Sequence, residues 1–385
     1  MWTNCTKYWI TSRTNMLYRL ILKARHFLYD SGMKKSYRSE VPSICIGNIT
    51  VGGTGKTPHT EMILRMLHET DEWGGKNIAV LSRGYKRYSW GFQQVSREGS
   101  AAMFGDEPLQ IKKKFPGITV AVDKDRVEGC RFLAHPALLE SRKSGKTVLN
   151  KNFPPADLII LDDAFQHRKL KADMNIILVN WNRPIFEDKL LPAGRLRDLP
   201  ERIDEADIII VTKCPSELSD WEKTKFAYKL GIRDYSTSSC DGTSPSGRRQ
   251  TILFTKIEYC GHKAVFSTAD PRYFYSKKLM MITGIANDGP LLSYLSDYYR
   301  IFKRLCFPDH HRYSRSDIRK ISSIIKDNPT ASIATTEKDA QRIIDCSFVP
   351  QAIRARIFYV PIEVSFLSQG EREKFKSILR EFKRS

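Results

Sequence analysis

Residues 41–64 read VPSICIGNITVGGTGKTPHTEMIL, and this stretch decides the fold. An apolar strand runs into a glycine-rich turn that ends in Gly-Lys-Thr, and a segment with helical periodicity follows. Glycines take backbone angles that other residues resist, so successive N–H groups of such a turn can point inward around an anion. The N-terminal end of the following helix adds its positive partial charge. The stretch therefore predicts a P-loop that holds a nucleotide triphosphate.

The loop departs from the P-loop pattern G-x-x-x-x-G-K-[ST] at one position. The first glycine of the pattern falls on Thr50, and a glycine stands earlier, at Gly47. Lys56 is expected to reach the β- and γ-phosphates of ATP, and the Thr57 hydroxyl to ligate Mg²⁺. The alternative is a glycine-rich strand-to-helix turn that carries a lysine by chance. The predicted nucleotide-binding residues are Thr50, Val51, Gly52, Gly53, Thr54, Gly55, Lys56 and Thr57.

The composition indicates a globular protein with an acidic partner. A hydrophobic content of 41% excludes wholesale disorder, and a length of 385 residues favours two domains over one. The net charge of +20 suits nucleic acid, an anionic membrane surface or a phosphorylated substrate. We predict no nucleic-acid partner, because the sequence has no basic-aromatic array of the kind that stacks bases. The eight cysteines have neither C-x-x-C pairs nor zinc-site spacing and are expected to be reduced.

Residues 16–29, MLYRLILKARHFLY, have the pattern of a basic amphipathic helix. Apolar residues recur at helical spacing, with Arg19, Lys23 and Arg25 between them. No uninterrupted apolar run reaches the roughly 18 residues of a spanning helix. We therefore expect residues 1–40 to lie in the interface of an anionic membrane. The alternative is a surface helix docked on its own domain.

The fold class predicted from the strand pattern is α/β. Apolar, β-branched runs without polar alternation recur, and stretches with helical periodicity at 60–68 and 125–133 separate some of them. This alternation implies a parallel sheet covered on both faces, so we assign residues 41–250 to a P-loop-type domain. The expected strands lie at 44–47, 78–82, 118–122, 158–161, 174–179 and 208–212.

A smaller C-terminal α/β domain is expected at residues 271–385, after a β-strand linker. Residues 235–250 are polar and turn-rich and indicate a surface loop. Residues 251–270 are predicted to form a hairpin with its turn near Gly261. A second series then has strands at 279–285, 332–336 and 357–360 and helices at 291–305, 314–325 and 370–382.

Two adjacent carboxylates, Asp162 and Asp163, follow an apolar strand in ADLIILDDAFQHRKL, residues 156–170. Ligands of open parallel sheets bind at the carboxyl ends of the strands, so these acids can meet a Mg²⁺ held by the P-loop threonine. The alternative is a surface loop that carries two acids. Gln166 and His167 follow within reach of the same site, and His167 is either an acid/base group or a structural imidazole.

A second group of candidate residues is separated in sequence from the P-loop. Asp106 stands at a helix start or in a loop, where it either caps the helix or faces a pocket. His310 lies in the turn FPDHHRYS, and histidine beside a carboxylate can deprotonate a hydroxyl. The arginines of LLPAGRLRD, among them Arg197, either clamp phosphate or form a solvated basic surface, and LSRGYKR at residues 81–87 offers the same choice.

Together these motifs resemble the tetraacyldisaccharide 4′-kinase family, the lipid A 4′-kinases of Gram-negative bacteria. The resemblance runs in order over most of the chain. The motifs that carry it are GNITVGGTGKTP (47–58), LSRGY (81–85), GDEP (105–108), LDDAFQHR (161–168), LLPAGRLRD (190–198), TGIAN (283–287), FPDHHRYS (307–314) and TTEKDAQR (335–342).

The resemblance implies transfer of the γ-phosphoryl group of ATP, with Mg²⁺, to the 4′-hydroxyl of lipid A disaccharide 1-phosphate. The product is lipid IVA of lipid A biosynthesis, and the reaction takes place at the cytoplasmic face of the bacterial inner membrane. The resemblance also implies two α/β domains joined by a β-strand linker and an N-terminal helix that holds a peripheral or monotopic enzyme on the bilayer. We expect a monomer.

The family's functional residues map onto this chain one by one. Lys56 and Thr57 correspond to the ATP and Mg²⁺ contacts, and Asp162 and Asp163 to the metal-side acids. Asp106 resembles the group that pairs with His310 to activate the 4′-hydroxyl. Arg197 and Asp198 match an arginine–acid pair near the phosphates, where the family often has glutamate at the second position.

The main alternative is a P-loop switch or partitioning-type ATPase that phosphorylates no substrate. Its P-loop and acidic residues would look the same in the sequence. An Asp106–His310 pair across the cleft would distinguish the kinase, because a nucleotide-dependent switch has no need for one.

Overall fold

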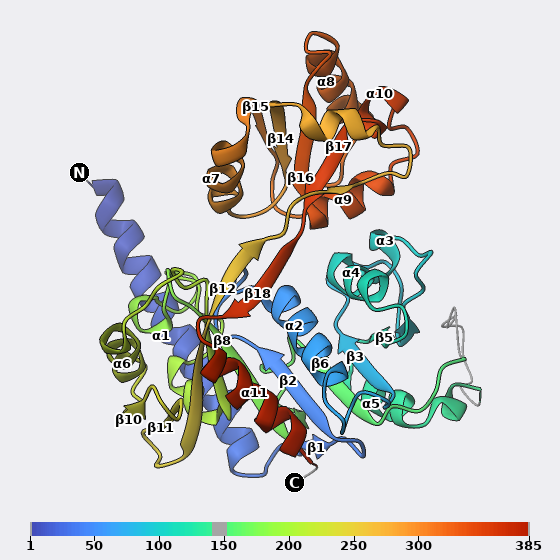
Figure 1. Ribbon diagram of the computed structural model, residues 1–385. Helices are drawn as coiled ribbons and strands as arrows, with labels where there is room; N and C mark the ends of the chain where they lie inside the picture. Colours follow the sequence, from blue (N-terminus) through green and yellow to red (C-terminus); the bar gives the residue numbers. More distant parts are fainter. Residues whose placement is uncertain (1, 141–151, 384–385) are drawn as a thin grey trace.

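The computed structural model describes the backbone of residues 2–140 and 152–383, with side chains from residue 15 onward. The chain forms two α/β lobes that are joined by two strands, β12 (Arg249–Tyr259) and β18 (Ile362–Phe366) (Figure 1). This arrangement confirms the predicted α/β fold class with a β-strand linker.

The first lobe is built around a mainly parallel sheet with the order β10-β11-β12-β9-β8-β2-β6-β3-β5-β4. Its central strands consist almost entirely of buried apolar residues, as expected for strands that are covered on both faces. The predicted strands 78–82 and 208–212 match β3 and β9. The bounds are β2 Ser43–Gly47, β3 Ile78–Ser82, β4 Gln93–Gln94, β5 Thr119–Val122, β6 Leu158–Asp162, β8 Met174–Asn180, β9 Ile208–Thr212, β10 Arg233–Ser236 and β11 Asp241–Thr243.

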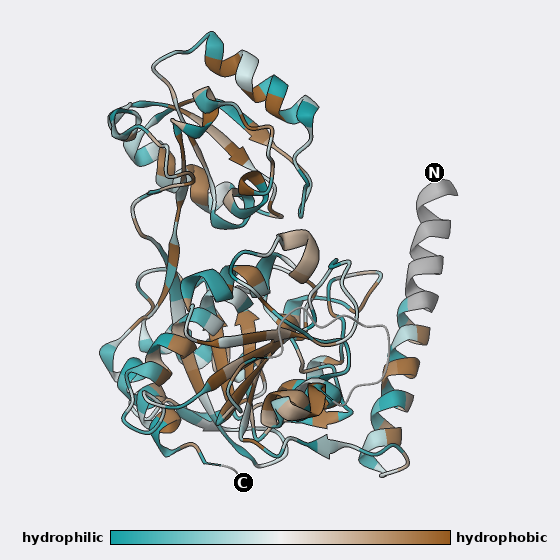
Figure 2. Ribbon diagram, turned by 90° about the vertical axis from the view of Figure 1, so that its right-hand side faces the viewer, coloured by the Kyte–Doolittle hydropathy of each residue, from teal (hydrophilic) through white to brown (hydrophobic). Residues whose placement is uncertain are grey.

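Two hydrophobic clusters cover the two faces of this sheet. On one face the strands pack with α2 (Lys56–His68), α4 (Asp106–Lys114) and α11 (Gln369–Glu381). On the other face they pack with α5 (Arg126–Ala134), α6 (Asp220–Lys229) and Leu22 of α1 (Trp2–Asp30). Figure 2 shows the brown, apolar strands enclosed by these layers. The short helix α3 (Ala101–Phe104) precedes α4, and β1 (Tyr37–Arg38) pairs with β7 (Leu170–Lys171).

The second lobe has a five-stranded sheet in the order β13-β17-β16-β14-β15. Its strands are β13 Lys263–Ala264, β14 Lys278–Thr283, β15 Arg300–Cys306, β16 Ser332–Thr336 and β17 Ile357–Val360. One face packs against α8 (Arg315–Lys326), α9 (Glu337–Ile344) and α10 (Gln351–Arg354), and the other packs against α7 (Gly289–Tyr298).

Several predicted elements differ from the structure. β12 does not form a hairpin with residues 262–267, because it pairs with β18 while β13 pairs with β17. Residues 235–250 are not only a loop, since β10 and β11 add antiparallel strands to the first sheet there. The helix predicted at 291–305 ends at Tyr298, and β15 follows it.

The last helix, α11, belongs to the first lobe and not to the C-terminal domain predicted for residues 271–385. Its Phe375 and Leu379 lie in the hydrophobic cluster of the first sheet, and the Trp73 indole donates a hydrogen bond to the Leu379 carbonyl at 2.9 Å. The chain therefore crosses the linker twice, which gives the second lobe two strands as its attachment.

Helix α1 docks on the first lobe through one face and leaves the other face exposed. Tyr18, Leu22 and His26 lie on the docked face. The exposed face carries apolar side chains along the same turns. Among the helices of the described residues, α1 included, none combines the length and apolar character that a membrane crossing requires. The exposed apolar residues are Met16, Leu17, Leu20, Ile21 and Phe27.

Candidate active site

The predicted P-loop lies between β2 and α2, as its sequence requires. Gly52, Gly53 and Gly55 have φ angles of 68°, 69° and 85°, which side-chain-bearing residues rarely adopt. A Cβ at Gly52 or Gly53 would meet no atom within 4 Å, so the space over the turn is open. Helix α2 begins at Lys56, directly behind this turn. The loop thus offers backbone N–H groups and a helix N-terminus to an anion.

Asn48, which the sequence reasoning did not select, joins the parts of this loop. Its side-chain amide donates to Thr54 Oγ1 at 2.8 Å. Its Oδ1 accepts from Lys56 Nζ at 3.3 Å and from Arg197 Nη2 at 2.6 Å. Asn48 is fully buried and therefore fixes both cations beside the turn. The motif contains this residue, but its sequence gives no sign of where an amide side chain points.

Asp162 and Asp163 stand at the carboxyl end of β6, beside the P-loop. Asp163 lies 3.6 Å from Lys56 Nζ and accepts from Arg197 Nη1 at 3.2 Å. Burial opposes its charge, but Lys56 and Arg197 outweigh this effect and lower the pKa of Asp163 to about 2. Asp163 is therefore a carboxylate near neutral pH.

Asp162 is buried, and its Oδ1 has no hydrogen-bond partner among the described residues. Burial, followed by the nearby charges of Glu107 and Asp163, raises the pKa of Asp162. A buried carboxylate oxygen without a partner is costly, and it fits a position from which Asp162 could bind a cation. No group of three His, Cys, Asp or Glu side chains in the described residues could hold a metal by itself. This agrees with Mg²⁺, which usually takes one or two protein ligands and completes its shell with phosphate oxygens and water.

The second lobe contributes His310, which contacts Asp106 at the start of α4. His310 Nδ1 lies 2.9 Å from Asp106 Oδ2. Arg342 of α9 donates to the same oxygen through Nη2 at 2.6 Å. Burial would raise the pKa of Asp106, but the hydrogen bonds with His310 and Arg342 lower it to about 2. The two residues that the sequence separates by two hundred positions are thus brought together across the two lobes.

A family model described as tetraacyldisaccharide-1-P 4′-kinase (LpxK) matches residues 8–383. The chain belongs to this family. It is 36% identical over 366 residues to the tetraacyldisaccharide 4′-kinase of Phocaeicola vulgatus. The aligned residues make up 94% of this chain and 91% of that protein. The tetraacyldisaccharide 4′-kinase of Bacteroides fragilis is 37% identical over 368 residues, with coverage of 93% and 89%.

A solved structure shares the fold of this 4′-kinase family member. The crystal structure of the "apo" form of LpxK from Aquifex aeolicus in complex with ATP covers 96% of this chain and 98% of its own, with a TM-score of 0.66. Its sequence identity of 24% limits the comparison to the fold. The two-lobed architecture is therefore common to this chain and the LpxK fold.

A further ion pair between the lobes lies beside the predicted site of this 4′-kinase family member. Lys338 Nζ of α9 lies 2.6 Å from Glu107 Oε1 of α4. Lys338 holds the pKa of Glu107 below its usual value, against the effect of burial. Lys56 also lowers this pKa, and Asp163 raises it. Both residues lie in motifs that the sequence had singled out, GDEP and TTEKDAQR, but without a role.

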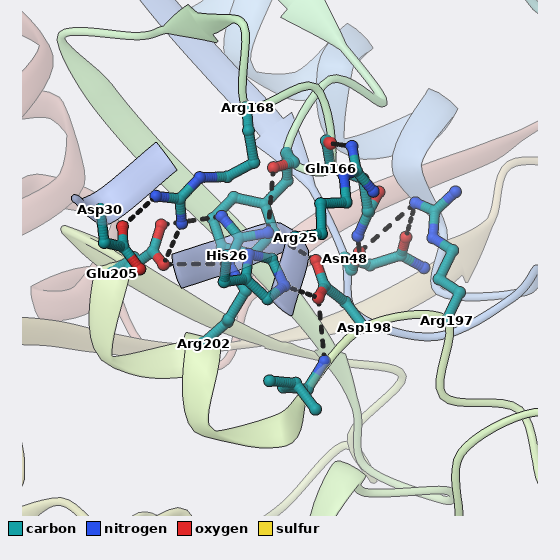
Figure 3. Close-up of polar contacts among 12 residues, drawn as sticks. Arg25, His26, Asp30, Asn48, Gln166, Arg168, Arg197, Asp198, Arg202 and Glu205 are labelled. Atoms are coloured by element: carbon teal, nitrogen blue, oxygen red, sulfur yellow. Dashed lines mark hydrogen bonds and ion pairs between the residues drawn. The ribbon is translucent and has the colours of Figure 1, made fainter. Parts of the chain in front are cut away.

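Asp198 does not join the contacts of the P-loop, although its neighbour Arg197 does. Asp198 points toward α1, where its Oδ1 lies 2.7 Å from His26 Nε2, and Arg202 donates to its other oxygen (Figure 3). Of the arginine–acid pair expected near the phosphates, only Arg197 contacts the P-loop residues, while the acid contacts His26 and Arg202. Asp198 instead fixes the segment that carries Arg197.

Gln166 and His167 take different positions. Gln166 Nε2 donates to the Asn48 carbonyl at 2.6 Å, which places Gln166 at the P-loop. His167 Nε2 is buried without a partner among the described residues, and burial followed by Arg126 lowers its pKa. Arg126 and Asp125 are the charges that act most on the pKa of His167, and within the described part of the chain no hydrogen bond joins it to Lys56.

Proposed function

We infer that the protein transfers the γ-phosphoryl group of ATP to the 4′-hydroxyl of tetraacyldisaccharide 1-phosphate and so forms lipid IVA. The main support is that the structure contains two groups of residues which only an enzyme that phosphorylates an acceptor needs together. One part is the P-loop with Lys56 and the two aspartates, and the other is the Asp106–His310 contact between the lobes. A nucleotide switch would need only the first part.

The P-loop half suits the nucleotide and its metal. The backbone of residues 50–57 and Lys56 would hold the phosphates, and the Thr57 hydroxyl with Asp162 would hold Mg²⁺. Mg²⁺ would neutralise the charge on the phosphate oxygens. Arg197 and Lys56 place two further cations at the same point, where charge is redistributed during phosphoryl transfer.

The Asp106–His310 half suits the acceptor hydroxyl. Because Asp106 has a pKa of about 2, it is an acceptor near neutral pH and favours the tautomer that carries the proton on His310 Nδ1. In this tautomer Nε2, which lies 4.0 Å from Asp309 Oδ2, carries no proton and can take the proton of the 4′-hydroxyl as the hydroxyl oxygen attacks phosphorus. Arg342 contacts the same carboxylate and fixes its orientation.

The acceptor is a lipid, so we further propose that the protein works as a monomer at the cytoplasmic face of the bacterial inner membrane. The apolar side chains that α1 exposes, with Arg19 and Lys23 between them, fit the interface of an anionic leaflet. Replacement of Leu20 and Ile21 by aspartate should release the protein from anionic vesicles. Unchanged co-sedimentation would exclude α1 from the membrane contact.

The deciding experiment incubates the purified protein with labelled ATP, Mg²⁺ and lipid A disaccharide 1-phosphate in detergent and separates the products by thin-layer chromatography. We expect a lipid product that carries the label, and none with Lys56→Ala. Release of labelled phosphate without labelled lipid would instead favour an ATPase.

A further inference from the structure

A short loop after β3 exposes three large aromatic side chains. Tyr85, Tyr88 and Trp90 have exposed fractions of 65%, 60% and 69%. We call residues 85–90 the aromatic loop. Single exposed aromatics are common, but three within six residues form a patch that needs an explanation.

The aromatic loop is held in place by its own polar groups. Arg87 donates to the Val122 carbonyl at 3.2 Å through Nη1 and to the Gly91 carbonyl at 2.6 Å through Nη2. The Tyr88 N–H and the Ser89 hydroxyl donate to carbonyls of helix α3, at 3.0 Å and 2.5 Å. These contacts fix the backbone of the loop. Binding of a partner to the rings therefore does not have to order this backbone at a further cost in conformational entropy.

Cations accompany the exposed rings. Lys124 Nζ lies 5.0 Å from the centre of the Trp90 ring, and Lys86 Nζ lies 5.5 Å from that of Tyr85. Arg83, just before the loop, is exposed as well. None of these three cations has an ion-pair partner within residues 15–140 and 152–383. Their charge is therefore available to an anionic partner.

The aromatic loop borders the proposed acceptor site and shares an edge of the sheet with α1. The Tyr85 ring meets the His310 ring edge-on, with 5.7 Å between the ring centres. Arg87 fastens the loop to the carboxyl end of β5, and Arg25 of α1 donates to the Gln166 carbonyl just beyond the carboxyl end of β6. Both elements are thus attached to the sheet where parallel strands end.

We propose that the aromatic loop is a second bilayer contact, in which Tyr88 and Trp90 enter the headgroup region of an anionic phospholipid membrane and Lys124 and Lys86 meet lipid phosphates. Aromatic rings with a polar edge, flanked by lysines, are the side chains that membrane interfaces favour. The proposal rests on the proposed function, because a lipid acceptor must bring its sugar hydroxyl to His310 while its acyl chains stay in the bilayer. The loop would hold the cleft against the membrane at that point.

The chain contains a matched control for Trp90. Trp221 on α6 is exposed to 67%, and Lys225 Nζ lies 4.4 Å from its ring centre, so the Trp221–Lys225 pair repeats the chemistry of Trp90 and Lys124. In Figure 1, helix α6, which carries this pair, lies on the other side of the first lobe from α4. The variants Trp90→Ala and Lys124→Gln are therefore compared with Trp221→Ala and Lys225→Gln.

The first measurement is co-sedimentation of the full chain with phosphatidylcholine vesicles that contain phosphatidylglycerol. We expect Trp90→Ala to weaken binding about tenfold and Lys124→Gln about fivefold, as one lost cation near an anionic leaflet implies. The Trp221 and Lys225 variants should bind as the unmodified protein does. The proposal would be overturned if the Trp90 and Trp221 variants bind vesicles equally well and both keep the unfolding temperature of the unmodified protein. If Trp90→Ala fails to fold, the comparison of Lys124→Gln with Lys225→Gln provides the test.

The second measurement separates the bilayer from the substrate sugar as the partner of the loop. With substrate embedded in vesicles, Trp90→Ala should raise the KM for the lipid. With substrate dispersed in detergent, kcat and KM should both stay unchanged. An equal rise of KM in both media, with normal vesicle binding, would mean that the loop contacts the sugar and would overturn the bilayer proposal. If the unmodified protein phosphorylates no lipid in detergent while the vesicle results hold, the proposed function fails and the bilayer contact stands.

Discussion

His26 of helix α1 and Asp198 of the first lobe form a buried contact in which Nε2 and Oδ1 are 2.7 Å apart. Their side chains are exposed by only 9% and 1%. The adjacent Tyr18 hydroxyl donates to the Arg197 carbonyl at 3.0 Å. Helix α1 is therefore attached to the same segment that carries Arg197 to the P-loop (Figure 3).

Replacement of Asp198 by alanine tests whether this contact supports the active site. The change leaves the buried His26 without this partner, while Arg202 keeps its contacts with Glu205, so we expect a loss of about 1–3 kcal/mol in the free energy of unfolding. We also expect a lower kcat, because Arg197 loses its fixed neighbour. The control is Glu201→Gln, which breaks only the exposed contact with Arg19 and should cost less than about 1 kcal/mol. Urea unfolding measures both, and equal losses would assign no special role to Asp198.

The orientation of Asp198 shows where sequence reasoning stops. Arg197 and Asp198 lie in a bend of the chain, where Arg197 donates to Asn48 while Asp198 contacts His26 of α1. The motif predicts that both residues are important but not that one serves the nucleotide and the other α1. The P-loop itself could be predicted because its glycines and lysine specify a backbone geometry locally.

The second strand of the linker, β18, was missed for a different reason. β12 looks like the first strand of a hairpin, but its partner β18 lies about a hundred residues later, with Thr255 opposite Phe366. Nothing local in the sequence specifies so distant a partner. Strands such as β3 and β9 could be placed because buried parallel strands are continuous apolar runs. β15, with a mixed pattern at a sheet edge, could not.

Asn48→Ala should reduce turnover more than nucleotide binding. The amide oxygen of Asn48 accepts from both Lys56 and Arg197, and without it the two cations keep only Asp163 as a common partner. Misplacement of charged groups by about 1 Å can cost about a hundredfold in rate. We expect kcat to fall by about 10–100-fold with a smaller change in the KM for ATP. Steady-state kinetics at varied ATP would contradict this if only KM changed.

His310→Ala should lower kcat by about 10²–10⁴-fold, the usual contribution of a general base, while ATP binding stays near normal. The neighbouring His311 is the control, because it is paired with Asp317 at 3.0 Å and stacks on Phe307 in the second lobe. His311→Ala should therefore affect stability more than turnover. Single-turnover rates with nucleotide titrations measure the difference, and parallel losses of rate and ATP affinity in His310→Ala would make this residue a nucleotide contact.

His59 makes the stability of the P-loop helix depend on pH. Its Nδ1 lies 2.7 Å from the Gly55 carbonyl and its Nε2 lies 2.9 Å from Thr255 Oγ1, so the imidazole connects the P-loop to the linker strand β12. Burial is the main effect that lowers its pKa from 6.5 to about 4. Below pH 6.5 the unfolded chain takes up a proton that the folded chain refuses until about pH 4. Stability is therefore lost as the pH falls through this window.

The size of the effect follows from the two pKa values. Between pH 7 and pH 5, protonation of this histidine in the unfolded chain should lower the free energy of unfolding by about 2 kcal/mol. His59→Gln keeps a polar side chain at the position and removes the titration. In urea unfolding at both pH values, the unmodified protein should lose about 2 kcal/mol more than His59→Gln, because the contributions of all other groups cancel in this difference. Equal losses in the two proteins would show that His59 is protonated in the folded state, and that its contacts with Gly55 and Thr255 do not depend on the neutral imidazole.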